Sequence, residues 1–550
     1  MNIGEMQRKL SLWAERNKER KFYDLYKPLY DKDWLWLAHV HVKQNAGSIT
    51  AGCDGINMRI FDEKLEENLQ NIIEELKSET FKPYPVRRVY IPKSNGKFRP
   101  LGIPSIKDRI VQQALRMILE PIYEAGFSQY SFGFRPNRCT TDAIKCITWS
   151  TAEWKKFFWI IEGDISSYFD TINHRKLYKI LKRRIEDKRT LRLIWKFLRA
   201  GVMEKKLFQD TKSGTPQGGI ISPLLANIYL HELDCYMKKY TELTRKEKTR
   251  RRKQGLANYV YIRYADDFVI LSNGTKEQVE SLKEELYTFL KNDLKLNLSK
   301  EKTQITHLND GFKFLGFEVI RSQGHNGMKT KVLIPDGAVS KVMDKITAAT
   351  DPTTHTDSVN TKILAINSIL EGWCRYYPYT SKANLQFQKV EYHAFWKMAH
   401  WLGRKFQIPM PEVMRKHCQA NKLGSKECQL RKATEFKTQI YKKRFIKPNP
   451  YIYQEKLERE ELPIESTWTG FEPRPGMADL RIQILERDEY TCQRCGDPVT
   501  ANTTHVDHRR PVRRFKKPAD ANRPENLWAL CIKCHKEKTE IDRQMESRMR

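Results

Sequence analysis

Tyr261-Ile262-Arg263-Tyr264-Ala265-Asp266-Asp267-Phe268-Val269-Ile270-Leu271 sets two adjacent acids among aromatic, β-branched and other apolar residues. This pattern predicts a β-hairpin that carries both acids at its tip. Two like charges side by side repel each other unless a cation lies between them. Because Mg²⁺ prefers oxygen ligands in such an arrangement, the acid pair indicates a divalent-metal site rather than a solvated turn.

The composition favours a polyanionic partner. The chain has 550 residues, with 99 Lys and Arg against 67 Asp and Glu and a formal net charge of +32. Nucleic acid is the first candidate and an anionic membrane surface the second. No apolar run approaches the ~20 residues of a membrane span. Met1–Lys21 lacks the apolar core of a secretory signal, so we expect no membrane partner.

The cysteines fall into two groups. Seven of the eleven are scattered singly between Cys53 and Cys428, which fits a reducing compartment. The other four form two Cys-x-x-Cys units near the C-terminus, a spacing typical of metal ligation rather than of disulfides.

Short strand-like runs alternate with amphipathic helices from about residue 80 to residue 320, which predicts an α+β domain. The expected strands are Arg87–Pro92, Trp159–Asp164, Tyr259–Tyr264, Phe268–Leu271 and Phe312–Ile320. The expected helices are Asp108–Leu119, Leu191–Leu198 and Lys276–Leu290, and residues 1–50 and about 340–430 also favour helix.

Two segments concentrate the positive charge. Lys238–Lys253 holds nine Lys and Arg against two Glu, and both a solvated projection and a nucleic-acid contact stay open for it. Residues 401–450 hold thirteen Lys and Arg against three acids, which predicts a surface that follows phosphates. The Pro-rich residues 446–476 predict a linker, and a compact Cys/His-rich module follows it.

A third acid, Asp164, ends the buried strand expected from Trp159. Two metal ions about 4 Å apart, as in phosphoryl transfer, need shared carboxylates, and Asp164 with Asp266 and Asp267 would supply them. The Gly-rich run Ser213–Pro223 carries Gln217, whose amide would face a nucleotide or template; an ordinary tight turn is the alternative. Arg88–Pro100 predicts a hairpin with Lys93, Lys97 and Arg99, either solvated or placed for a triphosphate.

The motifs and their order resemble those of group II intron-encoded reverse transcriptases that carry maturase and endonuclease domains. The matching blocks are Ala51–Ile56, Lys97–Pro104, Lys107–Arg109, Ser131–Pro136, the Asp164 strand, Pro216–Gly219, Tyr264–Asp267, Leu298–Thr303 and Phe314–Phe317. The resemblance covers nearly the whole chain.

This resemblance implies a right-hand polymerase with fingers, palm and helical thumb. It implies fingers and palm at 1–340, a thumb or maturase domain at 341–430, a basic DNA-binding segment at 431–475 and an endonuclease at 476–550. Asp164, Asp266 and Asp267 would hold two Mg²⁺ ions. Lys97, Arg99 and Gln217 would lie near the nucleotide, and Phe169 would exclude a 2′-hydroxyl unless it is simply a core aromatic.

Three further motifs keep two interpretations each. Lys302 would aid pyrophosphate departure or be a surface helix lysine. Phe314–Phe317 would support the primer end or form a buried strand. Ile366–Tyr377 resembles the thumb motif and would either pack the core or contact RNA.

The C-terminal module combines two metal sites. Cys492, Cys495, Cys531 and Cys534 make a set suited to tetrahedral structural zinc. The remaining motif resembles an HNH endonuclease of the ββα-metal class, in which His508 would activate water. Its metal ligands would be Asp507 and His535, with Asn526 orienting the loop or joining the metal shell; His535 beside Cys534 could belong to the zinc shell instead. His505 is expected to be a bystander, and Arg509 replaces a residue that is usually apolar in the family.

The resemblance therefore predicts a multifunctional enzyme that binds its intron RNA as a lariat ribonucleoprotein, assists splicing, nicks double-stranded target DNA and copies the RNA with dNTPs by target-primed reverse transcription. It implies a cytoplasmic protein, nucleoid-associated when on DNA, or an organellar one, and it leaves the oligomeric state open. Two alternatives remain: a maturase with inactive enzymatic parts, and a reverse transcriptase of a retron or defence lineage.

Overall fold

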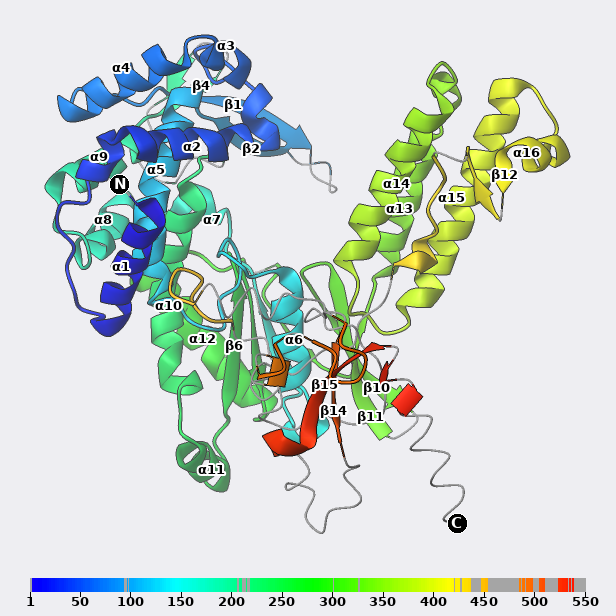
Figure 1. The fold of residues 1–550 in the computed structure, drawn as a ribbon. Helices are drawn as coiled ribbons and strands as arrows, with labels where there is room; N and C mark the ends of the chain where they lie inside the picture. The colour runs from blue at the N-terminus through cyan, green and yellow to red at the C-terminus, as the bar shows by residue number, and fades with distance from the viewer. Residues whose placement is uncertain are drawn as a thin grey trace. The chain divides into compact units, whose positions relative to one another are not determined.

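The computed structural model divides into two compact units, Met1–Glu461 and Leu462–Arg550. It describes residues 2–92, 96, 98–204, 207–209, 214, 218–299, 301–324, 327–419, 421–425, 428–436, 447–453, 484–485, 487–489, 491–497, 504–509, 523–532, 534–535 and 537–538. Helices and sheets are both abundant, so the α+β prediction is confirmed (Figure 1).

The N-terminal part of the first unit packs helices against a small mixed sheet. Its helices are α1 (Ile3–Arg16), α2 (Lys32–Lys43), α3 (Met58–Glu63), α4 (Leu65–Lys77) and α5 (Ile106–Glu124). Its strands β1 (Val86–Pro92), β2 (Phe98–Ile103), β4 (Val202–Glu204) and β5 (Leu207–Gln209) lie in the order β2-β1-β4-β5. The predicted hairpin of Arg88–Pro100 is confirmed, because β1 and β2 pair antiparallel with Pro92 opposite Phe98.

A four-stranded antiparallel sheet forms the centre of the first unit. Its strands β3 (Trp159–Gly163), β6 (Tyr259–Tyr264), β7 (Asp267–Ser272) and β8 (Gln304–His307) lie in the order β6-β7-β3-β8. Alternate residues face opposite sides, as the two-residue period of a strand requires. Ile161 and Ile270 join the core on the side of α10 (Ser222–Thr241) and α12 (Lys276–Asn292). Ile160 and Val269 join the core that contains α6 (Thr140–Ser150).

Shorter helices complete this region, and one of them carries most of the basic insertion. They are α7 (Tyr168–Thr171), α8 (His174–Lys182), α9 (Lys188–Leu198) and α11 (Arg245–Lys253). Lys238–Thr241 belongs to the last turn of α10, and the rest of the basic segment projects as α11 (Figure 1). None of the residues of α11 is buried, which agrees with a solvated projection.

The expected single strand Phe312–Ile320 is wrong. The chain forms β9 (Phe312–Phe314) and β10 (Phe317–Gly324), and β11 (Gly327–Leu333) completes a sheet in the order β11-β10-β9. The break falls at Leu315 and Gly316, whose φ angles of 49° and 73° are left-handed. Glycine adopts this conformation without steric cost, so the apolar run turns back on itself here.

A helical bundle follows, as the sequence predicts for residues 340–430. It consists of α13 (Asp336–Ala349), α14 (Val359–Tyr376) and α15 (Ala383–Phe406), followed by α16 (Met410–His417), β12 (Cys418–Gln419) and β13 (Lys422–Leu423). Its contacts are apolar, and they include Ile366, Leu370, Phe387 and Trp401. Tyr451 in the following segment donates a hydrogen bond to Glu120 of α5 at 2.8 Å, so residues near 450 return to the N-terminal part.

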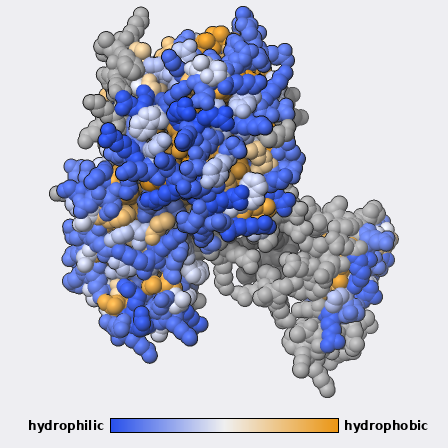
Figure 2. Space-filling model, turned by 90° about the vertical axis from the view of Figure 1, so that its left-hand side faces the viewer, coloured by the Kyte–Doolittle hydropathy of each residue, from blue (hydrophilic) through white to orange (hydrophobic). Residues whose placement is uncertain are grey.

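The second unit contains the antiparallel pair β14 (Thr504–His508) and β15 (Leu527–Cys531). Most of the predicted linker at 446–476 and of the basic segment at 431–475 lies outside the described residues. None of the described helices combines the length and apolar character that crossing a membrane requires. The face of the molecule in Figure 2 is largely hydrophilic, with hydrophobic residues in scattered spots.

Candidate active sites and metal centre

Three carboxylates lie at one end of the central sheet. Tyr264 pairs with Asp267 across the β6–β7 hairpin, so Ala265 and Asp266 form a two-residue turn in which Ala265 has a φ of 57°. The predicted hairpin with both acids at its tip is therefore confirmed. Asp164 directly follows β3, and β3 pairs with β7 through Gly163 and Phe268. Asp164 thus lies at the same end of the sheet as Asp266 and Asp267.

The electrostatics of this end favour a bound cation. Removal from bulk water, followed by the charges of its two neighbours, raises the pKa of Asp267 to about 6, although the residue remains accessible. The pKa of Asp266 is also raised, first by burial and then by Asp164. Lys302 opposes both shifts and places its Nζ 3.0 Å from Asp164 Oδ2. A set of repelling carboxylate oxygens is the donor chemistry that fits Mg²⁺.

Lys302 lies in a turn after β7 and α12, so the interpretation as a surface helix lysine is wrong. Its side chain is largely exposed and reaches back to the acids from the Leu298–Thr303 block. The backbone supports this approach, because Ser299 N donates to Asp164 O at 2.8 Å.

A buried arginine connects the β6–β7 hairpin to α10. Arg263 of β6 is fully buried and bonds both oxygens of Asp234 on α10, through Nε and Nη2, each at 2.7 Å. Its Nη1 donates to Asn227 Oδ1 at 2.9 Å and to the carbonyl of Ala265 at 3.0 Å. Burial opposes ionisation of Asp234, yet Arg263 holds the pKa of that carboxyl well below its usual range. The Ala265–Asp266 turn is therefore tied to α10.

The Ser131–Pro136 block closes the brace from another side. Phe132 N donates to Arg263 O at 2.9 Å, and Asn227 Nδ2 donates to Gly133 O at 2.7 Å. Gly133 packs so closely on the turn that a Cβ there would lie 2.3 Å from Ala265 N. Because a side chain at this position would collide with the turn, only glycine allows so close an approach.

The predicted nucleotide-binding residues are only partly described. Arg99 lies exposed on β2, and its positive charge opposes the rise in the pKa values of Asp266 and Asp267. Phe169 on α7 is half-buried and packs edge-on against Phe134, with ring centroids 6.3 Å apart. Lys97 and Gln217 lie outside the described residues, so their roles stay predictions. Gly218, beside Gln217, fits against β2, since a Cβ there would lie 2.3 Å from Gly102 O.

The bundle helix α14 holds the turn between β9 and β10. Tyr376 donates to Leu315 O at 2.9 Å, and Tyr377 donates to Gly316 O at 3.1 Å. Phe317 stacks on Tyr376 with centroids 5.3 Å apart. The Ile366–Tyr377 motif thus packs the core at its aromatic end, and the Phe314–Phe317 block forms a turn that the bundle fixes.

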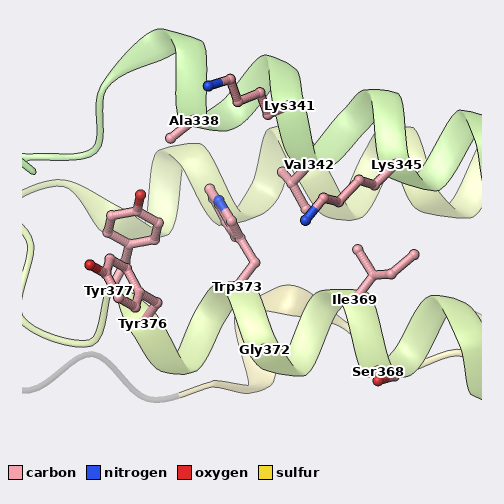
Figure 3. A pocket seen from close by; sticks show the side chains of 10 residues that line it. All are labelled: Ala338, Lys341, Val342, Lys345, Ser368, Ile369, Gly372, Trp373, Tyr376 and Tyr377. Atoms are coloured by element: carbon pink, nitrogen blue, oxygen red, sulfur yellow. The ribbon is translucent and has the colours of Figure 1, made fainter. Parts of the chain in front are cut away.

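A cavity of about 520 Å³ adjoins these tyrosines between α13 and α14. Figure 3 shows Trp373 standing between the two helices, with Lys341 and Lys345 on the α13 side. The Trp373 Nε1 is buried, and no partner for it lies among the described residues. The motif therefore combines core packing with a cationic, aromatic recess.

The four C-terminal cysteines form a metal-binding group. The Sγ atoms of Cys492, Cys495, Cys531 and Cys534 all lie within 4.8 Å of one another. Backbone amides support the thiols, as Cys531 N donates to Cys492 Sγ at 3.2 Å and Cys534 N to Cys531 Sγ at 3.4 Å. Four converging thiols suit tetrahedral Zn²⁺. Within the described part of the chain, no other group of three or more His, Cys, Asp or Glu side chains converges in this way.

The HNH residues gather around β14 and β15. Asp507 and His508 end β14 opposite Trp528 and Leu527, and Asn526 directly precedes β15. The Asn526 carbonyl accepts a hydrogen bond from Arg509 N at 2.6 Å. His535 stacks on His505 with centroids 4.4 Å apart, so His505 lies against a predicted metal ligand. The cysteine group forms without His535.

Several residues of these sites were not predicted. Arg263, Asp234 and Asn227 brace the hairpin, and Lys538 pairs with Asp507 at 3.0 Å. One signal was available for the brace: Arg263 is a charged residue inside an otherwise apolar strand, which requires a buried partner. The partner itself lies 29 residues away on a helix.

Comparison with known families agrees with this arrangement. Residues 91–319 match the reverse transcriptase (RNA-dependent DNA polymerase) family, residues 339–419 the group II intron maturase-specific domain, and residues 492–540 the HNH endonuclease family. Group II intron-encoded protein LtrA of Lactococcus lactis subsp. cremoris is 34% identical over 463 residues, 70% of this chain and 75% of LtrA. The chain belongs to the group II intron-encoded reverse transcriptases and maturases.

Two further relatives extend the comparison. Protein YkfC of Escherichia coli (strain K12) is 42% identical over 367 residues, which is 63% of this chain and 96% of YkfC. The putative COX1/OXI3 intron 2 protein of Saccharomyces cerevisiae is 32% identical over 341 residues, 54% of this chain and 38% of that protein. The intron-encoded protein is thus an RNA-directed DNA polymerase and an HNH endonuclease, with intron RNA and DNA as its partners. The maturase match disfavours a retron or defence lineage.

Proposed function

We propose that this intron-encoded protein binds its own intron as a lariat ribonucleoprotein, assists splicing, nicks one strand of target DNA, and copies the intron RNA from the nick. The single observation that carries the proposal is the placement of Asp164, Asp266 and Asp267 at one end of the central sheet, where the charges of Asp266 and Asp164 contribute to the raised pKa of Asp267. In the same chain, a maturase domain and an HNH module follow this polymerase site. The completeness of the three parts argues against a maturase with inactive enzymatic parts.

In this proposal, residues 1–340 serve as fingers and palm, 341–430 as thumb, 431–475 as a basic DNA-binding segment and 476–550 as the endonuclease. Asp164, Asp266 and Asp267 hold two Mg²⁺ ions, which when bound stabilise the attacking and leaving oxygens of nucleotidyl transfer. The Arg263 brace fixes the carbonyl of Ala265 and with it the direction of the Asp266 side chain. Such positioning supplies much of the rate in a reaction that needs aligned oxygens.

The nucleotide would lie between the β2 strand and the acids. Arg99 and Lys97 would pair with its phosphates, Gln217 would contact it from the glycine loop, and Phe169 would stand beneath the sugar. The half-buried position of Phe169 supports this role, because a ring anchored on one face by Phe134 leaves little freedom to make room for a 2′-hydroxyl.

In the HNH module, His508 would accept a proton from the attacking water, and Asp507, Asn526 and His535 would hold one divalent metal. Asp507 now pairs with Lys538 at 3.0 Å, so a metal bound here would take the place of this ammonium group at the carboxylate. The four cysteines would hold a structural Zn²⁺ and fix β15, which runs from Leu527 to the zinc ligand Cys531.

The polymerase assignment is tested by the double substitution Asp266→Asn with Asp267→Asn. We expect it to abolish primer extension on an RNA template while intron RNA binding and splicing assistance remain. His508→Ala should remove DNA nicking and leave extension of a supplied primer intact. Full primer extension by the double variant would refute the metal assignment, and nicking by the His508 variant would refute the HNH assignment.

A further inference from the structure

A groove of about 470 Å³ lies at the end of the central sheet opposite the three carboxylates. Leu256 precedes β6, Lys156 precedes β3 and Asn273 follows β7, and all three line this groove. The acids lie where the same strands have their other ends. Since a strand advances about 3.3 Å per residue, the six residues of β7 separate the two ends by about 20 Å.

One exposed tryptophan, Trp154, lines the groove, and a second, Trp149, contacts the groove residue Lys155. Trp154 is 76% exposed and Trp149 is 48% exposed. Lys155 lies between them, because its Nζ donates to Trp149 O at 2.8 Å and lies 4.9 Å from the centre of the Trp154 ring. Exposed tryptophans that lie close together beside a lysine offer flat apolar faces on which a nucleic-acid base can stack.

The chain holds these tryptophans in place. Trp154 belongs to a short 3-10 helix, Glu153–Lys155, whose Glu153 pairs with Arg321 of β10 through Nε at 2.8 Å. Thr330 of β11 donates to Thr151 O at 3.0 Å just before it. Trp154 is therefore an exposed ring on an anchored segment, a geometry that a stacking platform needs.

The opposite side of the groove is the basic helix α11, from which Arg252 lines the groove. Seven of its nine residues are Lys or Arg, and no carboxylate among the described residues forms an ion pair with them. Like charges this dense destabilise a helix. The helix is nonetheless capped by the Thr244–Glu247 box and tied at its base, where Arg251 donates to Ala257 O at 2.8 Å.

The positive charge here is not neutralised within the described part of the chain. Burial, together with the neighbouring charge of Lys248, lowers the pKa of Lys155 to about 8. A phosphate in the groove would offset this repulsion, so the surroundings favour a polyanion.

We propose that the groove between Glu153–Lys155 and α11 binds an unpaired strand of the intron RNA, with Trp154 stacking on a base and α11 pairing with the flanking phosphates. This inference rests on the proposed function and assigns it a contact surface that the polymerase site does not include. An unpaired strand fits best, because a duplex hides the base faces that a tryptophan stacks on. At about 20 Å from the acids, the groove leaves the polymerase site free for template and primer.

The test uses the full chain and the transcript of the intron that encodes it. Trp154→Ala should weaken RNA binding about 5- to 150-fold, because a lost base stack costs that much in affinity. Lys248→Gln with Arg252→Gln should make the plot of log affinity against log salt shallower by about 1.4, or 0.7 for each charge. Lys64→Gln with Lys77→Gln, two exposed lysines at the two ends of α4, is the matched control for charge and should leave the slope unchanged.

Trp154→Phe should restore most of the affinity, because it restores an aromatic face. Primer extension on a short template should equal that of the unsubstituted chain in every variant, which also shows that each one is folded. Unchanged affinity and salt slope in both groove variants would overturn the proposal. The proposal would also be overturned if the groove variants bound an unrelated single-stranded DNA less tightly while their affinity for the intron RNA stayed unchanged, since the groove would then serve DNA. If the unsubstituted chain shows no preference for its intron, the proposed function fails first.

Discussion

Substitutions of the buried Arg263–Asp234 pair, which holds the β6–β7 hairpin, should show that the enzyme's activity and its stability depend on different contacts of Arg263. Arg263→Met removes four hydrogen bonds, two to Asp234 and one each to Asn227 and the Ala265 carbonyl. It also leaves the buried Asp234 carboxylate with His231, whose Nδ1 lies 3.5 Å away, as its remaining cationic partner. Removing one partner of a buried ion pair costs about 3–5 kcal/mol.

Because the folding unit is large, this loss in the free energy of unfolding lowers the unfolding midpoint only modestly. With an unfolding entropy of about 2.1 cal/mol/K per residue, a unit of 461 residues has about 1 kcal/mol/K. The unfolding midpoint should therefore fall by about 3–5 °C. Primer extension should fall by about 100-fold, because the Ala265–Asp266 turn loses its fixed position and catalytic oxygens misplaced by about 1 Å lose that much rate.

The double substitution Arg263→Met with Asp234→Leu separates the two effects. Apolar residues of similar size often replace a buried ion pair at no net cost, so the midpoint should return to near that of the unsubstituted chain. Primer extension should stay low, because the donor to the Ala265 carbonyl is still missing. Arg183→Met is the control, since its pair with Glu232 is exposed and contributes at most about 1 kcal/mol. The assays are thermal unfolding followed by tryptophan fluorescence, and extension of a labelled primer. Additive midpoint losses in the double variant, or normal extension in either variant, would refute the reasoning.

Three further outcomes are expected. Gly133→Ala should reduce primer extension at least about 10-fold, since its Cβ would lie 2.3 Å from Ala265 N, whereas Gly337→Ala in α13 meets nothing within 4 Å and should stay active. Burial opposes the charge on His231, but Asp234 and Cys235 raise its pKa to about 9. Its stabilising contribution should therefore be complete below pH 6.5 and lost as the pH rises through 9, and urea unfolding of His231→Gln should show a flatter pH profile. Cys531→Ser should lower bound zinc, measured by atomic absorption, and abolish nicking, while extension of a supplied primer continues; unchanged zinc would contradict the four-thiol site.

Local patterns predicted the arrangement of the acids and of the four cysteines well. The Tyr261–Leu271 hairpin and the Asp164 strand follow from alternation and turn signals within about ten residues, and the two Cys-x-x-Cys units follow from spacing alone. These features depend on neighbours in the chain, so a single sequence contains the information that decides them.

Features decided by distant contacts could not be predicted in this way. The apolar run Phe312–Ile320 suggests one strand, yet it breaks at Leu315 because Tyr376 and Tyr377, 61 residues further on, bond the carbonyls of the turn. Arg263 signals a buried partner, but only the fold reveals that the partner is Asp234. The ion pair of Asp507 with Lys538 likewise depends on how the second unit closes on itself.

The three acids at one end of the central sheet lower the stability of the folded chain. Three carboxylates repel one another there, and the raised pKa values of Asp266 and Asp267 express that repulsion. The turn stays in place because α10, β6 and the segment around Gly133 hold it through buried groups. The same strands are buried on both faces, so the sheet that carries the acids at one end and the basic groove at the other is stiff over about 20 Å. A rigid spacer of this length allows the protein to hold its intron at one end while it copies RNA at the other, and neither task requires the other site to open.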